Sequence, residues 1–353
     1  MVLWPGAVFA LCSASLFGAS TPFAKLLLGT IDPWLLAALL YLGSGVGLGI
    51  VFLIRKLRGF TATSDQQLDR AGWLSLAGAI FSGGVVGPIL LMIGLSRTSA
   101  SAASLLLNLE GVMTALLAWF LFKENFDRRI AAGMAAIVGG AAALSWQGSL
   151  SFEQIVGPLM IAGACFAWGI DNNLTRKVSL SDPVYISMLK GLVAGAINLL
   201  LAALQGAFIP NALAIASAGL VGFFGYGLSL VLFVLALRHL GTARTGAYYS
   251  TAPFVGAILS IGLLGDSITF RFLIATVLMG GGVWLHLTER HEHEHEHEPM
   301  RHTHKHRHDI HHDHKHEADD PPGEPHAHAH THVGLRHSHH HFPDTHHRHR
   351  HGA

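Results

Sequence analysis

The sequence predicts an all-α membrane protein, with ten transmembrane helices arranged as two inverted five-helix repeats, plus a disordered tail. Of its 353 residues, 51% are hydrophobic and only 13% are charged, about half the charged fraction of soluble domains. The long apolar runs end at Thr288. The part before that residue can bury its side chains only in lipid, whereas the remainder lacks the apolar residues for a core. The apolar part also repeats itself, which sets the arrangement of the helices.

Ten stretches are long and apolar enough to cross a bilayer, which takes about 20 predominantly apolar residues. Short connections, often carrying Pro, Gly or Asp, separate most of them, and only the loop from Arg55 to Asp69 is long. The predicted spans lie at 6–26, 33–54, 73–95, 100–122, 129–147, 155–175, 184–205, 213–237, 243–264 and 270–288.

The basic residues indicate the orientation of the chain in the membrane. Loops on the side shared with the N-terminus hold eleven Lys and Arg residues, and the opposite loops hold only Lys25, Arg97 and Arg271. Because cytoplasmic loops are enriched in Lys and Arg, we expect both termini of this multi-pass protein in the cytoplasm. The even number of spans agrees with this, and a bacterial-type inner (plasma) membrane is the expected location.

An internal repeat divides the apolar part into two halves. Residues 107–126 align without gaps on residues 249–268, at an offset of 142. Each half holds five spans, and an odd number gives the halves opposite orientations, the inverted-repeat plan of many secondary transporters. The expected domains are residues 1–147, residues 148–289 and the tail, residues 290–353. The aligned pairs are Glu124 with Asp266, Arg129 with Arg271 and, at an offset of 151, Phe17-Gly18 with Trp168-Gly169.

Four segments carry a resemblance to a known family. They are Leu16 to Lys25, Glu110 to Glu124, Trp168-Gly169, and Pro253 to Asp266. Over residues 6–288 the chain resembles the EamA domain of the drug/metabolite transporter superfamily. The resemblance implies ten helices in two repeats and the transport, often the export, of a small metabolite without chemical transformation.

The chain departs from the family pattern at Gly111, where the family usually has a proline that the second repeat keeps as Pro253. Glycine keeps the backbone N–H that proline removes, so the resemblance does not carry a bend over to the 100–122 span. The candidates for helix bends are Pro22, Gly111 and Pro253.

Ionisable side chains at membrane depth are functional candidates because they are costly to place there. Glu110 lies near the middle of the 100–122 span, where an ionised carboxylate costs about 3 kcal/mol or more. It therefore has to be protonated, paired or in contact with water. We interpret it as a carboxylate that couples to a proton or to substrate; the alternative is a structural partner of the backbone or of Lys190.

Lys190 sits seven residues into a span that begins at Pro183, at a depth of about 10 Å for 1.5 Å per residue. This depth favours a side chain that reaches back to the cytoplasmic interface over one that binds substrate. The run Asp171-Asn172-Asn173 lies near the cytoplasmic end of the 155–175 span and predicts an interface cluster. Trp168 and Asn172 can nevertheless share a cavity wall with Glu110.

A third group of polar side chains, in the 243–264 span, occupies the region that the repeat relates to Asn108. These side chains are either donors in a cavity or ordinary packing residues. The substrate or coupling candidates are therefore Asn108, Glu110, Trp168, Asn172, Lys190, Tyr248, Tyr249 and Ser250.

Histidine dominates the tail, where 24 of the 26 histidines of the chain lie between His291 and His351. Neutral imidazole is a common ligand of Zn, Ni, Co and Cu, and His-x-His spacing in a flexible chain lets neighbouring rings reach one ion. We therefore expect the tail to bind divalent transition metals, while no cofactor is required. The first metal-ligand candidates are His291, His293, His295, His297, His302, His304, His306, His308, His311, His312, His314 and His316.

Two other interpretations of the tail remain. The His-Glu alternation of residues 291–298 is typical of an added purification tag, although it covers only the first eight residues of the tail. The tail can also act as a charged brush, since imidazoles with a reference pKa of about 6.5 gain charge between about pH 7.5 and 5.5.

Two functional hypotheses follow, and they can combine. One is a gradient-driven permease for a small metabolite or a metal-chelating compound, and the family resemblance implies that it works as an exporter. The other is a metal-ion transporter, or a metal buffer or sensor in which the tail is the main functional part. The spans lack the His or Asp pairs of a dedicated ion pathway, which favours an organic or chelated substrate. No phosphate-binding loop occurs, so neither ATP-driven transport nor an enzyme is expected. The expected partners are the lipid bilayer, a small-molecule substrate and transition metal ions, with no nucleic acid, in a monomer or homodimer.

Overall fold

The computed structural model describes residues 5–59, 68–122, 128–146, 152–179 and 181–288, and four short stretches of the tail. The chain forms two compact units, Met1–Glu289 and Arg290–Ala353. The described residues of the first unit contain helices and turns and no strand. In its first half the elements are α1 (Pro5–Leu27), α2 (Pro33–Leu57), α3 (Arg70–Ala79), η1 (Ile80–Val86), α4 (Gly87–Ser96), α5 (Ala100–Leu106), α6 (Leu109–Phe122) and α7 (Arg128–Ser145). In its second half they are α8 (Phe152–Arg176), α9 (Pro183–Leu204), α10 (Ala212–Gly222), η2 (Phe223–Leu228), α11 (Ser229–Tyr249), α12 (Ala252–Leu264) and α13 (Phe270–Leu287).

The predicted spans all fall on helices, which confirms the predicted fold class of the apolar part. Among the described residues, seven helical stretches are long and apolar enough to cross a membrane, and two shorter apolar helices follow at Ala252–Leu264 and Phe270–Leu285. One predicted boundary is wrong. The chain was expected to leave the helix between 237 and 243, but α11 continues to Tyr249, because a single glycine without a proline does not end a helix.

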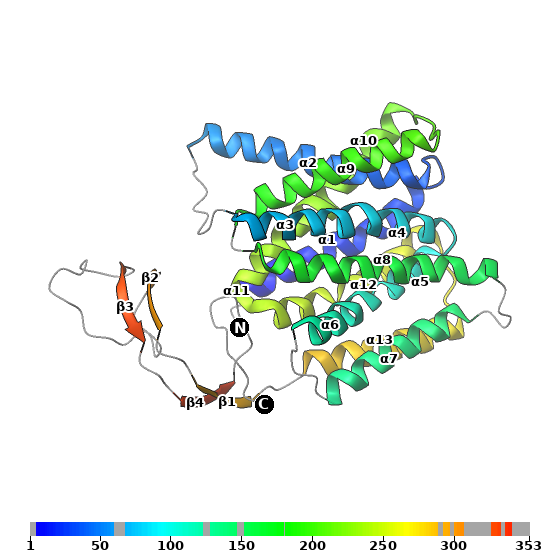
Figure 1. Cartoon of the computed structure of the whole chain (residues 1–353). Coiled ribbons are helices and arrows are strands. Elements are labelled where there is room, and N and C mark those ends of the chain that lie inside the picture. The colour runs from blue at the N-terminus through cyan, green and yellow to red at the C-terminus, as the bar shows by residue number, and fades with distance from the viewer. Residues whose placement is uncertain are drawn as a thin grey trace. The chain divides into compact units, whose positions relative to one another are not determined.

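Helices of one repeat pack on helices of the other in matched pairs (Figure 1). α2 lies against α9, and α7 lies against α13, so that equivalent helices meet each other. α1 contacts α11 and α12, and the equivalent helix α8 contacts α4 and α6. Each of these contacts between the repeats thus has a counterpart with the repeats exchanged, as a two-fold relation between inverted halves requires.

The equivalent helices α2 and α9 have the same N-terminal cap. Asp32 accepts hydrogen bonds from the backbone N–H groups of Trp34 and Leu35 at the start of α2. Asp182 does the same for Val184 and Tyr185 at the start of α9. In each repeat the Asp is followed by a proline at the first helical position, which needs no hydrogen-bond acceptor there.

Both repeats also carry a π-helix at the same place. η1 spans Ile80–Val86, and η2 spans Phe223–Leu228, close to an offset of 142 residues. A π-helix contains an extra residue per turn and leaves backbone carbonyls without their usual partners. In η1, Tyr41 Oη and Trp168 Nε1 donate hydrogen bonds to the carbonyl of Gly83, at 2.7 and 2.9 Å. The π-helix is therefore tied to helices α2 and α8.

A second repeat-related irregularity is a break in one span of each half. α5 ends at Leu106 and α6 begins at Leu109, while α11 ends at Tyr249 and α12 begins at Ala252. Pro253 has no N–H to donate to the carbonyl of Tyr249, which accounts for the second break. From the resemblance, no bend was expected in the 100–122 span, because Gly111 replaces the proline of the family. The span is nevertheless interrupted.

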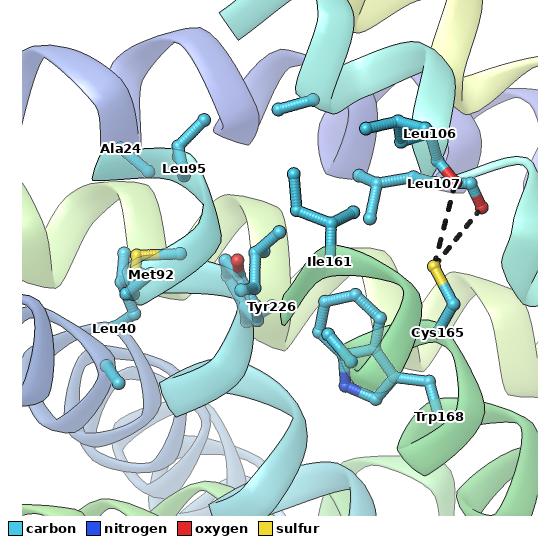
Figure 2. Packing of buried hydrophobic residues seen from close by; sticks show 14 of the residues in the cluster. Ala24, Leu40, Met92, Leu95, Leu106, Leu107, Ile161, Cys165, Trp168 and Tyr226 are labelled. Carbon is cyan, nitrogen blue, oxygen red and sulfur yellow. Dashed lines mark hydrogen bonds between the residues drawn. The ribbon is translucent and has the colours of Figure 1, made fainter. Parts of the chain in front are cut away.

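The first break has a local cause in Asn108. Its side-chain Nδ2 donates to the carbonyl of Leu105 at 3.0 Å, so the side chain competes with the helix backbone for that acceptor. Figure 2 shows the Cys165 thiol facing the carbonyls of Leu106 and Leu107 at this break, with sulfur–oxygen distances of 3.8 and 4.0 Å. In contrast to these breaks, Pro22 lies inside an uninterrupted α1.

The core of the first unit consists of aliphatic and small residues from both repeats. Leu40, Met92, Leu95, Leu106 and Ile161 are almost completely buried (Figure 2). The cluster continues toward Trp168 and Tyr226, whose rings lie at the edge of the cavity that both halves share.

The second unit contains four described strands. β1 (Glu292–Glu296) pairs with β4 (Arg336–His340), and β2 (Met300–His306) pairs with β3 (His326–His332), both antiparallel. These stretches differ from the disorder that we expected for the tail. Their His-x-His alternation repeats every second residue, which suits an extended strand.

Candidate functional site

A cavity of about 70 Å³ lies between the two repeats, with room for several water molecules. It is lined by residues from α1, α2, α6, α8, α9, η2 and α11. Five of the eight substrate or coupling candidates line it, namely Glu110, Trp168, Asn172, Lys190 and Tyr249.

Glu110 is positioned by the break in its span. It is the second residue of α6, where the unpaired N–H groups of the helix start favour a negative charge. Asn172 Nδ2, on α8, donates to Glu110 Oε1 at 2.8 Å, and lies 3.3 Å from Thr114 Oγ1. The structure thus brings Glu110, Asn172 and Trp168 together at one cavity, as the sequence suggested for these three side chains.

Lys190 and Asp171 correct two predictions. Lys190 is 3% exposed and does not reach the interface, and Asp171 is buried rather than part of an interface cluster. Lys190 Nζ lies 2.6 and 2.9 Å from the two carboxylate oxygens of Asp171 and 3.1 Å from Thr175 Oγ1. The prediction failed because the partner lies on another helix, so depth along α9 alone could not reveal it. The alternative that Lys190 pairs with Glu110 is also not what the structure shows.

Six aromatic side chains also line the cavity. Phe17 is their centre, with ring centroids 5.8 Å from Trp168, 5.8 Å from Tyr226 and 5.6 Å from Tyr249. Tyr41 lies 5.5 Å from Tyr226. These distances are typical of aromatic pairs in contact. The cavity therefore combines a continuous aromatic surface with a small number of charged groups.

Three candidates do not line the cavity. Asn108 is buried at the break, with Nδ2 directed to the carbonyl of Leu105 and 3.9 Å from Met279 Sδ. Ser250, the residue after the end of α11, donates to the carbonyl of Gly246 in that helix, and Tyr248 is not among the lining residues. Tyr249, the neighbour of both, does line it.

The sequence analysis missed several lining residues. They are Phe17, Tyr41, Ser44, Asp171, Ser187, Gly191, Gly225, Tyr226, Ser229, Leu230 and Phe233. A usable signal was present for the tyrosines, because a hydroxyl in the middle of an apolar span needs a partner in the protein.

Of the two acidic residues that the repeat relates, Glu124 and Asp266, only Asp266 can be placed. Asp266 Oδ2 accepts a hydrogen bond of 2.8 Å from the backbone N–H of Ser101, at the start of α5. Lys25 Nζ donates to the carbonyls of Leu95 and Thr98 near the end of α4, at 2.6 and 2.7 Å. Glu124 lies outside the described residues.

The metal-ligand candidates belong to the tail. Among the side chains that the structure describes, no three His, Cys, Asp or Glu groups gather as a metal site. His293, His295, His302, His304 and His306 lie in described strands. The other candidates lie outside the described residues: His291, His297, His308, His311, His312, His314 and His316.

Comparison with known proteins identifies the first unit. A model of the EamA-like transporter family matches the chain twice, over residues 4–146 and 155–288. The chain belongs to the EamA-like transporter family. This family is part of the drug/metabolite transporter superfamily, and the protein is a multi-pass membrane transporter.

Individual proteins similar to this EamA-like transporter are also described as transporters or as a flippase subunit. An uncharacterized transporter of Methanothermobacter thermautotrophicus is 27% identical over 304 residues, which cover 80% of this chain and 86% of the relative. One of Archaeoglobus fulgidus is 24% identical over 285 residues, 78% of this chain and 95% of the relative. A probable 4-amino-4-deoxy-L-arabinose-phosphoundecaprenol flippase subunit ArnE of Pseudomonas fluorescens is 37% identical over 94 residues, 27% of this chain and 79% of the relative. A solved crystal structure, 18% identical, superposes with a TM-score of 0.61 over 79% of this chain and 94% of that chain, and supports the fold.

Proposed function

We propose that this EamA-like transporter is a gradient-driven permease, working as an exporter, that carries a small organic metabolite through the central cavity. The observation that carries the proposal is that both repeats line one cavity containing a carboxylate, Glu110. In inverted-repeat transporters the substrate site lies at the interface of the repeats, beside interrupted helices. The breaks after Leu106 and Tyr249 and the π-helices η1 and η2 supply such interruptions in both halves.

The chemistry of the cavity favours an organic substrate over a bare metal ion. Among its described lining residues, Asp171 and Lys190 neutralise each other. A bare cation needs several oxygen or nitrogen ligands to replace its water, whereas six of the sixteen residues of this wall are aromatic and one of its two carboxylates is paired with Lys190. Glu110 is then the group that binds a coupling proton or the substrate. A metal-chelating compound remains within this class, because its organic part contacts the protein.

Replacing Glu110 with glutamine should lower export by about tenfold or more, the equivalent of one lost contact to a charged group. The test compares cells that lack the transporter with cells expressing the wild-type chain or Glu110→Gln at equal membrane levels. Mass spectrometry of the medium identifies compounds that accumulate only with the wild type. Equal accumulation with Glu110→Gln contradicts the role of Glu110, and no accumulating compound contradicts export.

We further propose that the tail lies in the cytoplasm and binds divalent transition metals there. The excess of Lys and Arg in loops on the N-terminal side supports this location. The strand register supports metal binding, because it sets His302, His304 and His306 opposite His330, His328 and His326. Histidine is a common ligand of divalent transition metals, and the register brings histidine positions of two strands to the same level.

Removing the tail after Glu289 should abolish most metal binding by the full-length protein. Equilibrium dialysis of purified wild-type and truncated chains against Zn²⁺, Ni²⁺, Co²⁺ and Cu²⁺ measures the bound ions per chain. The expected result is several ions on the wild type and nearly none on the truncated chain. Growth of cells carrying either version at toxic metal levels shows whether the tail serves transport. Equal binding by both chains would contradict a metal-binding tail.

A further inference from the structure

The charged side chains that line the cavity differ in whether they have a partner of opposite charge, and Lys190 and Asp171 have one. The ammonium of Lys190 has three N–H donors, and three acceptors surround it: both oxygens of Asp171 and Oγ1 of Thr175. Thr175 Oγ1 in turn donates to Asp171 Oδ1 at 2.7 Å. The lysine therefore has no donor left for an anionic substrate, and the pair carries no net charge.

Glu110 is the charge that remains. Asn172 Nδ2 occupies Oε1, and no described lysine, arginine or histidine lies within ion-pair distance of this carboxylate. The charged residues that line the cavity are Glu110, Asp171 and Lys190. With Glu110 ionised, the cavity has a net charge of −1, and its low-polarity walls strengthen the attraction of a cation.

The aromatic surface suits the same ligand. Tyr41 and Trp168 direct their hydrogen-bond donors to the carbonyl of Gly83, so their rings contribute apolar surface and π-electrons. Phe17, Phe233 and Tyr249 continue this surface, with Phe233 and Tyr249 4.8 Å apart. An organic cation is attracted to aromatic faces and packs its carbon body against them.

One further group indicates that a ligand belongs in the cavity. Ser187 is one of the residues that line it, is fully buried, and its Oγ has no hydrogen-bond partner among the described residues. A buried hydroxyl without a partner is unfavourable, and a polar group of a bound ligand can supply one. We infer that the substrate is an organic cation, an ammonium group on an aromatic or apolar body, with Glu110 holding the charge. This inference rests on the proposed function, because it names the substrate class of the same cavity.

A matched series of probes tests the inference. Phenethylamine, 2-phenylethanol and phenylacetate share an aromatic body and carry charges of about +1, 0 and −1 at neutral pH. Calorimetric titration of the purified full-length protein should show that phenethylamine binds at least about tenfold more tightly than either of the others. Equal binding of the alcohol or the acid by the wild type overturns the inference without any variant.

Two variants locate the charge. Glu110→Gln should lose the preference for phenethylamine while binding 2-phenylethanol within about twofold of the wild type, and Glu110→Asp should keep the preference. A preserved preference in Glu110→Gln overturns the role of Glu110 in binding the cation. If Glu110→Gln does not fold, the order of probe affinities of the wild type and of Glu110→Asp still tests whether the cavity prefers a cation. Binding of the probes is measured without transport. If the protein ranks the probes as expected but exports no compound, the proposed export function is refuted, whereas the inferred substrate class is not.

Discussion

Replacing Lys190 with methionine should destabilise the protein by about 3–5 kcal/mol, because it leaves the carboxylate of Asp171 buried without its cation. The two side chains are 4% and 10% exposed, and their closest atoms are 2.6 Å apart. Both side chains are therefore largely shielded from bulk solvent. Thermal unfolding of the detergent-purified full chain should show a markedly lower melting temperature for Lys190→Met than for the wild type.

The double variant Lys190→Met with Asp171→Asn is the matched control for this prediction. It removes both charges and keeps the side-chain volumes similar, so most of the lost stability should return. If Lys190→Met is as stable as the wild type, the prediction is wrong, and Asp171 is hydrated or protonated without a loss of stability. A double variant as unstable as the single one would assign the loss to packing rather than to charge.

The apolar runs and the internal repeat were sufficient to predict the fold of the membrane part. A span is recognised from its length and composition alone, and an odd number of spans per repeat requires inversion. The continuation of α11 to Tyr249 and the π-helices η1 and η2 were not predicted. In η1 the carbonyl of Gly83 accepts hydrogen bonds from side chains on α2 and α8, and periodicity along one helix does not show which side chains of other helices will lie there.

The cavity was predicted only in part, for a related reason. Glu110 and Asn172 were recognisable because polar side chains in a span are rare. Tyr41, Tyr226 and Phe233 lie in apolar runs, where an aromatic residue can face lipid, core or cavity. The pairing of Lys190 with Asp171 joins two helices. One sequence does not show which helices are neighbours until they pack.

Replacing Gly18 with alanine should disrupt the contact between the repeats and cost about 1–3 kcal/mol of stability. A β-carbon at Gly18 would overlap the carbonyl oxygen of Ala252, the first residue of α12. At the related Gly169, a β-carbon would lie 3.1 Å from the backbone of Met113 and Thr114. Both glycines come from the motif that the repeats share, and both let a helix approach the interrupted span of the other half. Backbone atoms cannot move aside as a flexible side chain can, so Gly18→Ala should also reduce export.

Gly281→Ala is the control for this prediction, because a β-carbon there meets no atom within 4 Å. Alanine favours the helical state over glycine by about 1 kcal/mol, so Gly281→Ala should match or exceed the wild type in melting temperature. If Gly18→Ala behaves like Gly281→Ala in both melting temperature and export, close approach at the shared motif is not what holds the repeats together. If only Gly18→Ala loses both, the shared glycine serves the packing of the interrupted helices around the cavity.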